Sequence, residues 1–262
     1  MNMLEAERLS ITFGGVRAIE QVSLAIRSGL VFSIIGPNGA GKTTLFNLLS
    51  GLYQPQDGRF RFCGEDVTGL APHRLARLGL SRTFQNLQIF FRMTALENVM
   101  VGRHRHETTD LLSDLLHLPA VTRQNRRTRD AARAALARVE LEAYADQPAG
   151  SLPYGALKRL EIARALASEP KALLLDEPAA GCNPVETRKL EAIVRSIATD
   201  GITVVLVEHD MRLVMNVSDR IHVLASGRTL VEGTASEVRA HPAVIEAYLG
   251  IHGSQEAARA VG

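Results

Sequence analysis

Residues 36–43 read Gly-Pro-Asn-Gly-Ala-Gly-Lys-Thr and carry the sharpest chemical signal in the chain. The pattern is G-x-x-x-x-G-K-[ST], with Gly36, Gly41, Lys42 and Thr43 at its fixed positions. Glycines let backbone N–H groups turn inward around phosphate oxygens, the lysine reaches the β- and γ-phosphates, and the hydroxyl binds Mg²⁺. The segment therefore predicts a site for ATP with Mg²⁺. We also expect Asn38, Gly39 and Thr44 to contact the nucleotide.

Two adjacent acids, Asp176 and Glu177, follow the apolar run 172–175. An α/β sheet places its ligands at the carboxyl ends of its strands, where these two carboxylates would stand. We expect Asp176 to hold Mg²⁺, directly or through water. We expect Glu177 to act as the general base that polarises the attacking water. An acidic pair after a strand is often only the start of a helix, so this prediction depends on the glycine loop in the same chain.

These residues need strands and helices to position them. The mostly apolar run 30–35 predicts a buried strand before the glycine loop, and the leucine spacing of 43–50 predicts a helix after it, which argues against a chance glycine turn. Two later apolar strands each follow a helical stretch, with helices at 157–167 and 187–198 and strands at 172–175 and 202–207. Strands that alternate with helices predict an α/β fold with a mostly parallel sheet covered on both faces.

Other segments differ from this alternation. The first 26 residues predict an antiparallel β part beside the parallel sheet, and residues 86–150 are mainly helical in pattern. Residues 123–138 carry six arginines against one acid, Asp130. A nucleic-acid patch is one interpretation, but a solvated helix face is favoured because alanines and Leu136 supply an apolar stripe. The small, polar tail at 254–262 is expected to fray.

Composition excludes several classes of protein. A chain of 262 residues with 46% hydrophobic residues can bury a core without disulfides or a structural metal. Its two cysteines, Cys63 and Cys182, lack metal-ligand spacing. No apolar run approaches the ~20 residues of a membrane-spanning helix, and residues 1–10 lack the order of a signal peptide. We therefore expect a cytoplasmic chain, and a net charge of +2 does not indicate a nucleic-acid partner.

Taken in order, these motifs resemble those of the ATP-binding subunits of ABC transporters over nearly the whole chain. The resemblance implies that Gln85, within Arg-Thr-Phe-Gln-Asn at 82–86, contacts Mg²⁺ and the attacking water and senses a membrane subunit. It implies that His209 contacts the γ-phosphate and that residues 180–183 cross a dimer interface. Phe13 is placed like the aromatic that stacks on adenine, although a β-sheet core residue is the other interpretation.

Residues 152–156 depart from the family pattern, which is close to Leu-Ser-Gly-Gly-Gln. They read Leu-Pro-Tyr-Gly-Ala, so Pro153 and Ala156 replace a hydroxyl and an amide. Tyr154 and Gly155 stay as candidates for contacting nucleotide across a dimer. Proline offers neither a hydroxyl nor a backbone N–H to a phosphate, which would weaken the composite site. In the other interpretation, Pro153 simply starts the following helix with Ser151 as its cap.

The resemblance also implies the organisation and the partners of the protein. It implies a single ABC ATPase domain over residues 1–262. The P-loop core of this domain holds the mostly parallel sheet, and a helical subdomain lies at about 86–155. It implies ATP hydrolysis by a homodimer or by a heterodimer with a second ATP-binding subunit. This dimer would drive integral membrane permease subunits from the inner face of the cell membrane, with a periplasmic solute-binding protein acting indirectly.

One branch of the family is the most similar. The motifs at 13–15, 82–86, 176–184 and 241–250 look like those of branched-chain amino acid importers, and importers of amides and urea are similar to these. Two alternatives use the same loop. A soluble ABC ATPase acting on ribosomes or DNA usually carries two cassettes or long coiled-coil insertions, and a P-loop kinase or GTPase does not need Gln85 and His209 in this order. We expect no nucleic-acid partner.

Overall fold

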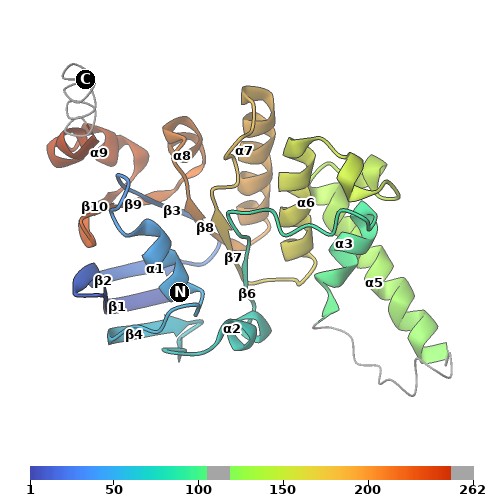
Figure 1. Ribbon diagram of the computed structural model, residues 1–262, viewed down its shortest axis with the longest axis horizontal. Helices are drawn as coiled ribbons and strands as arrows, with labels where there is room; N and C mark the ends of the chain where they lie inside the picture. Colours follow the sequence, from blue (N-terminus) through green and yellow to red (C-terminus); the bar gives the residue numbers. More distant parts are fainter. Residues whose placement is uncertain (105–118, 249–262) are drawn as a thin grey trace.

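The computed structural model describes residues 1–104 and 119–248, so the fraying predicted for 254–262 lies outside the described residues. Two sheets form its frame (Figure 1). The larger has the order β10-β9-β3-β8-β7-β6, with strands β3 (Val31–Ile35), β6 (Leu80–Arg82), β7 (Ala172–Asp176), β8 (Thr203–Val207), β9 (Arg220–Ala225) and β10 (Arg228–Gly233). The smaller has the order β2-β1-β4-β5, with β1 (Asn2–Phe13), β2 (Val16–Arg27), β4 (Asp57–Phe62) and β5 (Glu65–Asp66).

The larger sheet is parallel except at one edge. Strands β6, β7, β8, β3 and β9 pair in parallel, and only β10 runs antiparallel to its neighbour β9. The smaller sheet is antiparallel throughout. The predicted α/β fold with a mostly parallel sheet and an antiparallel β part is therefore confirmed. The antiparallel part also recruits residues 57–66, which the sequence pattern did not indicate.

Alternating side chains place the larger sheet between two apolar layers. On β7, Leu173 and Leu175 face one layer while Leu174 faces the other, as the two-residue period of a strand requires. Helix α1 (Lys42–Leu49) fills the space between the two sheets. Helices α6 (Tyr154–Leu166) and α7 (Pro184–Thr199) cover the opposite face. The remaining helices of the sheet region are α2 (Pro72–Leu78), α8 (Met211–Val217) and α9 (Ala235–Ala240).

The chain between strands β6 and β7 of the larger sheet is mainly helical. Helices α3 (Ala95–Val101) and α5 (Pro119–Arg138) pack with α6, and 3-10 turns lie at Glu142–Tyr144 and Ala149–Ser151. In Figure 1 these helices form the side of the molecule away from α9. On α5 the buried face is made by Ala132, Ala135 and Leu136, whereas the arginines from 123 to 133 are exposed. This arrangement fits the solvated-face interpretation, and the subdomain boundary at about 86–155 stays a prediction.

Among the described residues, no helix combines the length and the hydropathy that a membrane crossing requires.

Arg159 fastens α6 to the end of α5. Its guanidinium donates to the carbonyl oxygens of Val139, at 2.7 Å, and Glu140, at 3.1 Å, and its side chain is only 10% exposed. Arg159→Met keeps most of the apolar stem but leaves both carbonyls unpaired. We expect the free energy of unfolding to fall by about 1.5–3 kcal/mol, as for hydrogen bonds to charged groups. Urea denaturation measures this, with the exposed Arg133→Met as the control; equal stabilities would contradict the prediction.

Candidate functional site

The glycine loop joins β3 to α1. Gly41 stands at the N-cap of α1 with φ of 100°, and a Cβ at this position would lie 2.6 Å from the carbonyl oxygen of Ala18. Only glycine combines that backbone conformation with that close approach. No side chain caps α1, so the first N–H groups of the helix point to an open end. These N–H groups and the positive end of the helix dipole make a phosphate site.

Lys42 folds back onto the loop that it follows. Its Nζ donates to the carbonyl oxygens of Gly36, at 2.7 Å, and Pro37, at 3.0 Å. Burial lowers the pKa of Lys42 below its usual value, and the carboxylate of Glu177 opposes that shift. The ammonium therefore already lies within the loop, and the two carbonyl oxygens take two of its three donors, so one is left for a phosphate.

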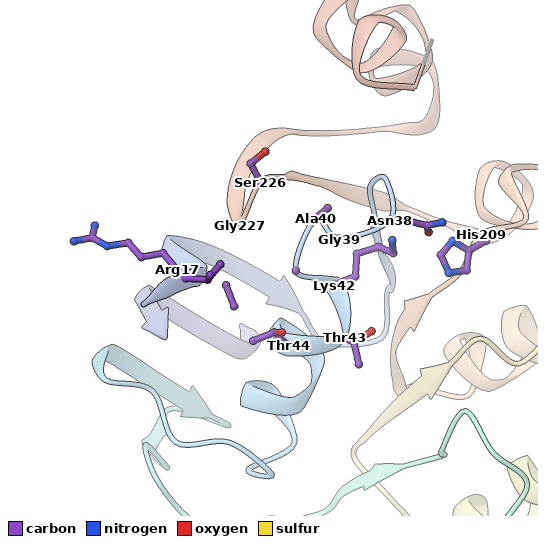
Figure 2. A pocket seen from close by; sticks show the side chains of 13 residues that line it. Arg17, Asn38, Gly39, Ala40, Lys42, Thr43, Thr44, His209, Ser226 and Gly227 are labelled. Atoms are coloured by element: carbon purple, nitrogen blue, oxygen red, sulfur yellow. The ribbon is translucent and has the colours of Figure 1, made fainter. Parts of the chain in front are cut away.

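A cavity of about 570 Å³ opens over the loop (Figure 2). The predicted residues that line it are Asn38, Gly39, Gly41, Lys42, Thr43, Thr44 and His209. Sequence reasoning missed the others, which are Val16, Arg17, Ala18, Ala40, Ser226 and Gly227. Gly227 donates its N–H to the carbonyl oxygen of Ala40 at 2.9 Å, so the turn between β9 and β10 braces the loop. A Ser-Gly pair predicts a turn, but nothing local indicates that this turn reaches residue 40.

Phe13 lies outside the set of residues that line the cavity. Its side chain is exposed, and its ring stands edge to face with Tyr53, with ring centroids 5.2 Å apart. The exposure shows that Phe13 is not a buried core residue of the sheet. Its contact with adenine stays a prediction, and Val16 is an exposed apolar residue that does line the cavity.

Three predicted catalytic residues meet beside the cavity. Glu177 follows β7 with φ of 48°, and its N–H donates to the carbonyl oxygen of Val207 at 2.9 Å. One carboxylate oxygen of Glu177 lies 2.6 Å from Nε2 of His209, and the other accepts from Nε2 of Gln85 at 3.1 Å. Three segments that are distant in sequence therefore fix the carboxylate from both sides, which is a suitable arrangement for a general base.

Asp176 lies behind this cluster and is buried. Its Oδ2 accepts from Nη2 of Arg82 at 2.8 Å, and its N–H donates to Oγ1 of Thr83 at 3.2 Å. Burial raises the pKa of Asp176, and the Arg82 guanidinium opposes this shift. Arg82 was not predicted as a site residue, although it belongs to the motif at 82–86.

Oxygen donors suit Mg²⁺, and the three predicted ligands offer a hydroxyl, a carboxylate and an amide oxygen, from Thr43, Asp176 and Gln85. Within residues 1–104 and 119–248, no group of three or more His, Cys, Asp or Glu side chains is placed to hold a metal ion. Three protein ligands would leave the rest of an octahedral Mg²⁺ shell to phosphate oxygens and water. The residues fit Mg²⁺ bound with a nucleotide.

Tyr154 and Gly155 begin α6 and do not line the cavity. Pro153 is the N-cap of this helix and makes no side-chain cap. The prediction that Ser151 caps the helix is wrong, because its Oγ donates instead to the carbonyl oxygen of Pro148 at 2.8 Å within a 3-10 turn. The start of α6 thus leaves its first N–H groups without a side-chain partner, on a surface where the Tyr154 ring is exposed.

This combination of a glycine loop, strand-end acids and a parallel sheet defines a nucleotide-binding α/β protein. The family profile described as ABC transporter matches residues 19–180, and one described as branched-chain amino acid ATP-binding cassette transporter matches residues 228–253. The chain therefore belongs to the family of ABC transporter ATP-binding proteins.

Curated relatives and solved structures agree with this placement. The high-affinity branched-chain amino acid transport ATP-binding protein BraF of Pseudomonas aeruginosa is 47% identical, and the alignment covers 95% of this chain and 98% of BraF. The corresponding LivG of Escherichia coli K12 is 42% identical with the same coverage. An ATP-binding cassette of an ABC transporter in its ADP conformation superposes with a TM-score of 0.84 at 33% identity, covering 95% of this chain and 99% of that one. A dimeric bacterial ABC transporter cassette gives 0.75 at 26% identity, covering 89% and 99%.

Lys42 gives a test of the phosphate site. In Lys42→Ala we expect the affinity for MgATP to fall about ten- to a hundredfold, because a charged hydrogen bond to phosphate contributes about 1.5–3 kcal/mol. Equilibrium binding of ATP measures this, and Lys189→Ala, which removes an exposed lysine on α7, is the control. Unchanged affinity in Lys42→Ala would show that nucleotide does not bind at this loop.

Glu177 gives a test of the chemistry. Glu177→Gln keeps the shape of the side chain but cannot accept a proton, so hydrolysis should slow by ~10²–10⁴-fold while ATP still binds. The variant should also accumulate as an ATP-bound dimer in size-exclusion chromatography. The control is Glu191→Gln, which changes a carboxylate whose partner is the surface residue Asn216. A monomer with near-normal turnover would contradict the assignment of the base.

Proposed function

We propose that the protein is the ATP-hydrolysing subunit of an importer for branched-chain amino acids. The observation that carries the proposal is the carboxylate of Glu177, held between Gln85 and His209 beside the phosphate cavity. The names of BraF and LivG support the solute class. The curated relatives reported above are transport proteins and lend no support to the alternative of a soluble ATPase acting on ribosomes or DNA.

Each residue of the site has a separate role in ATP hydrolysis. Lys42 pairs with the β- and γ-phosphates from its place within the loop, while the N–H groups at the start of α1 hold the same phosphates. Mg²⁺, when bound, neutralises phosphate charge, and Thr43, Asp176 and Gln85 are the residues that would hold it. Glu177 accepts the proton of the attacking water, and His209 orients Glu177 and approaches the γ-phosphate.

A second ATP-binding subunit completes the site in this proposal. The cavity of one chain includes neither Tyr154 nor Gly155, although the ring of Tyr154 is exposed at the start of α6. On the same side of the chain, Gly181 lies against the Tyr154 ring. A partner that faced this surface would place its own nucleotide over the start of α6. The dimeric cassette among the similar structures supports this arrangement.

A groove on the chain suits a membrane subunit. It has a volume of about 230 Å³, and its lining residues include Leu52, Pro72, Ala76, Leu80 and Phe84. Phe90 and Phe91 add two further exposed aromatic rings from the segment that follows Gln85. A groove lined by exposed apolar side chains such as those of Leu52 and Phe84 favours a protein contact. We infer that an apolar cytoplasmic segment of a permease subunit docks here, which places the protein on the inner face of the membrane; a periplasmic solute-binding protein would act only through the permease.

Uptake by cells of the source organism that lack this gene tests the function and the solute together. The wild-type chain should restore uptake of radiolabelled leucine, and Glu177→Gln should not. An excess of unlabelled valine should compete, whereas urea or acetamide should not. Restored urea uptake without leucine uptake would move the assignment to an amide or urea importer. Uptake that stays at background for all of these solutes would contradict an import function.

Pro153 stands where the family has a serine that bonds to the γ-phosphate of the partner's nucleotide. We expect Pro153→Ser to raise the ATPase rate of the assembled transporter by roughly ten- to a hundredfold, because a charged hydrogen bond contributes about 1.5–3 kcal/mol. Serine at the N-cap also stabilises a helix by about 0.5–2 kcal/mol. The melting temperature without nucleotide measures the effect of the new N-cap on stability, and the turnover rate measures the effect of the phosphate contact. Equal or lower turnover in a folded variant would defeat the prediction.

A further inference from the structure

Arg82, at the end of β6, contacts the end of α1, the end of β7 and the ring of Phe84. Its Nη1 donates to Oδ1 of Asn47, at 2.7 Å, and to Oγ of Ser50, at 2.6 Å, at the end of α1. Its Nη2 donates to Oδ2 of Asp176 at 2.8 Å, at the end of β7. The rings of Phe46 and Phe84 lie 4.8 Å and 5.4 Å from the guanidinium carbon. The Arg82 side chain is 10% exposed, so little solvent screens these contacts.

The same guanidinium belongs to two sites. Arg82 lines the apolar groove together with Ser50 and Phe84, and the ring of Phe84 is 42% exposed there. It also makes the side-chain hydrogen bond to Asp176, the predicted Mg²⁺ ligand. A segment that docks in the groove would press on the Phe84 ring, and through it on the plane of the guanidinium. Only one side chain separates the groove from the carboxylate.

The chemistry of arginine makes this link rigid. Guanidinium is planar and always charged, and its donors keep a fixed fork. Nη1 is held by α1 and Nη2 by Asp176, so tilting the plane at Phe84 must change at least one of these bonds. The buried Nε has no hydrogen-bond partner, so the hydrogen bonds of the guanidinium are made by Nη1 and Nη2. A buried carboxylate such as Asp176 also cannot lose its charged partner without a large cost.

We propose that Arg82 is a positioning residue that couples occupancy of the groove to the position of the Asp176 carboxylate. The proposal rests on the function proposed above, because it takes the groove as the permease contact and Asp176 as the Mg²⁺ ligand. Coupling between two sites is reciprocal, so binding of Mg²⁺ with nucleotide must also change the surroundings of the Phe84 ring. This second direction can be measured on the isolated chain.

Phe84→Trp supplies the reporter, because the chain contains no tryptophan of its own. Tryptophan keeps an aromatic face against the guanidinium and gives one emission signal from the groove. The ligand is the non-hydrolysable analogue AMP-PNP, added with Mg²⁺ or with EDTA, and its binding is measured separately by calorimetry. We expect a change in the emission of this tryptophan on adding AMP-PNP with Mg²⁺ that is absent or much smaller with EDTA.

Three further variants, each made in the Phe84→Trp chain, separate coupling from folding. Arg82→Lys keeps a positive charge beside Asp176 but loses the fork, and it should abolish most of the Mg²⁺-dependent emission change. Affinity for AMP-PNP in EDTA should stay within about twofold, since Arg82 does not line the phosphate cavity. Ser50→Ala keeps the pair with Asp176, removes one anchor on α1, and should reduce the change partially. Arg195→Met, which breaks the surface pair with Asp219, is the matched control.

The outcomes distinguish this proposal from the function on which it rests. Nucleotide binding with Mg²⁺ that leaves the tryptophan emission unchanged would overturn the coupling and leave the ATPase assignment intact. A full emission change in Arg82→Lys would overturn the role of Arg82. Failure of the Phe84→Trp chain to bind AMP-PNP under any condition, when the wild type also fails, would overturn the proposed function and the coupling with it. Arg195→Met could also reduce the emission change as much as Arg82→Lys does. That result would show a general structural effect and overturn the positioning role of Arg82.

Discussion

The parallel register of β3, β8 and β7 is the constraint on which the site depends. Val207 pairs with Ile34 on one side and with Asp176 on the other, so three strands end at the same level. The residues that follow them are therefore forced together. The glycine loop leaves β3, Glu177 leaves β7, and Glu208 and His209 leave β8. A shift of one register step in either pairing would separate Glu177 from His209, whatever the local sequence of each segment.

Buried charges then hold these strand ends in place. Glu208 is buried and accepts from the N–H groups of Ala179, at 2.7 Å, and His209, at 2.9 Å, and burial raises its pKa. The carboxylate of Glu208 thus fastens the segment after β7 to the segment after β8. Lys158, also buried, directs its Nζ toward the carbonyl oxygens of Gln85 and Glu177. Because charges in such surroundings require partners, the backbone around the candidate base has few alternative arrangements.

The strands and loops that carry the motifs could be predicted because their signals are local. A glycine spacing, a run of apolar residues and a leucine period each describe a few consecutive residues. The strands β9 and β10 and the turn at Ser226 and Gly227 could not be placed in the site this way, because their contact with Ala40 crosses most of the chain. Arg82 was missed for a similar reason: an arginine is usually exposed, and its burial depends on Asn47 and Asp176 meeting it. The Ser151 cap was wrong because a preceding 3-10 turn takes the hydroxyl.

The hydrogen bond from Gly227 to Ala40 also has a consequence for the chain as it is synthesised. The turn that supports the glycine loop is made well after the loop itself, because Gly227 follows Ala40 by 227 − 40 = 187 residues. At about 5–20 residues per second, roughly 10–40 s of synthesis separate the two. During that interval the loop lacks the N–H group that fixes its carbonyl, and the edge of β3 that later receives β9 stays open. The loop therefore acquires the support of this hydrogen bond only once the chain has been made through Gly227.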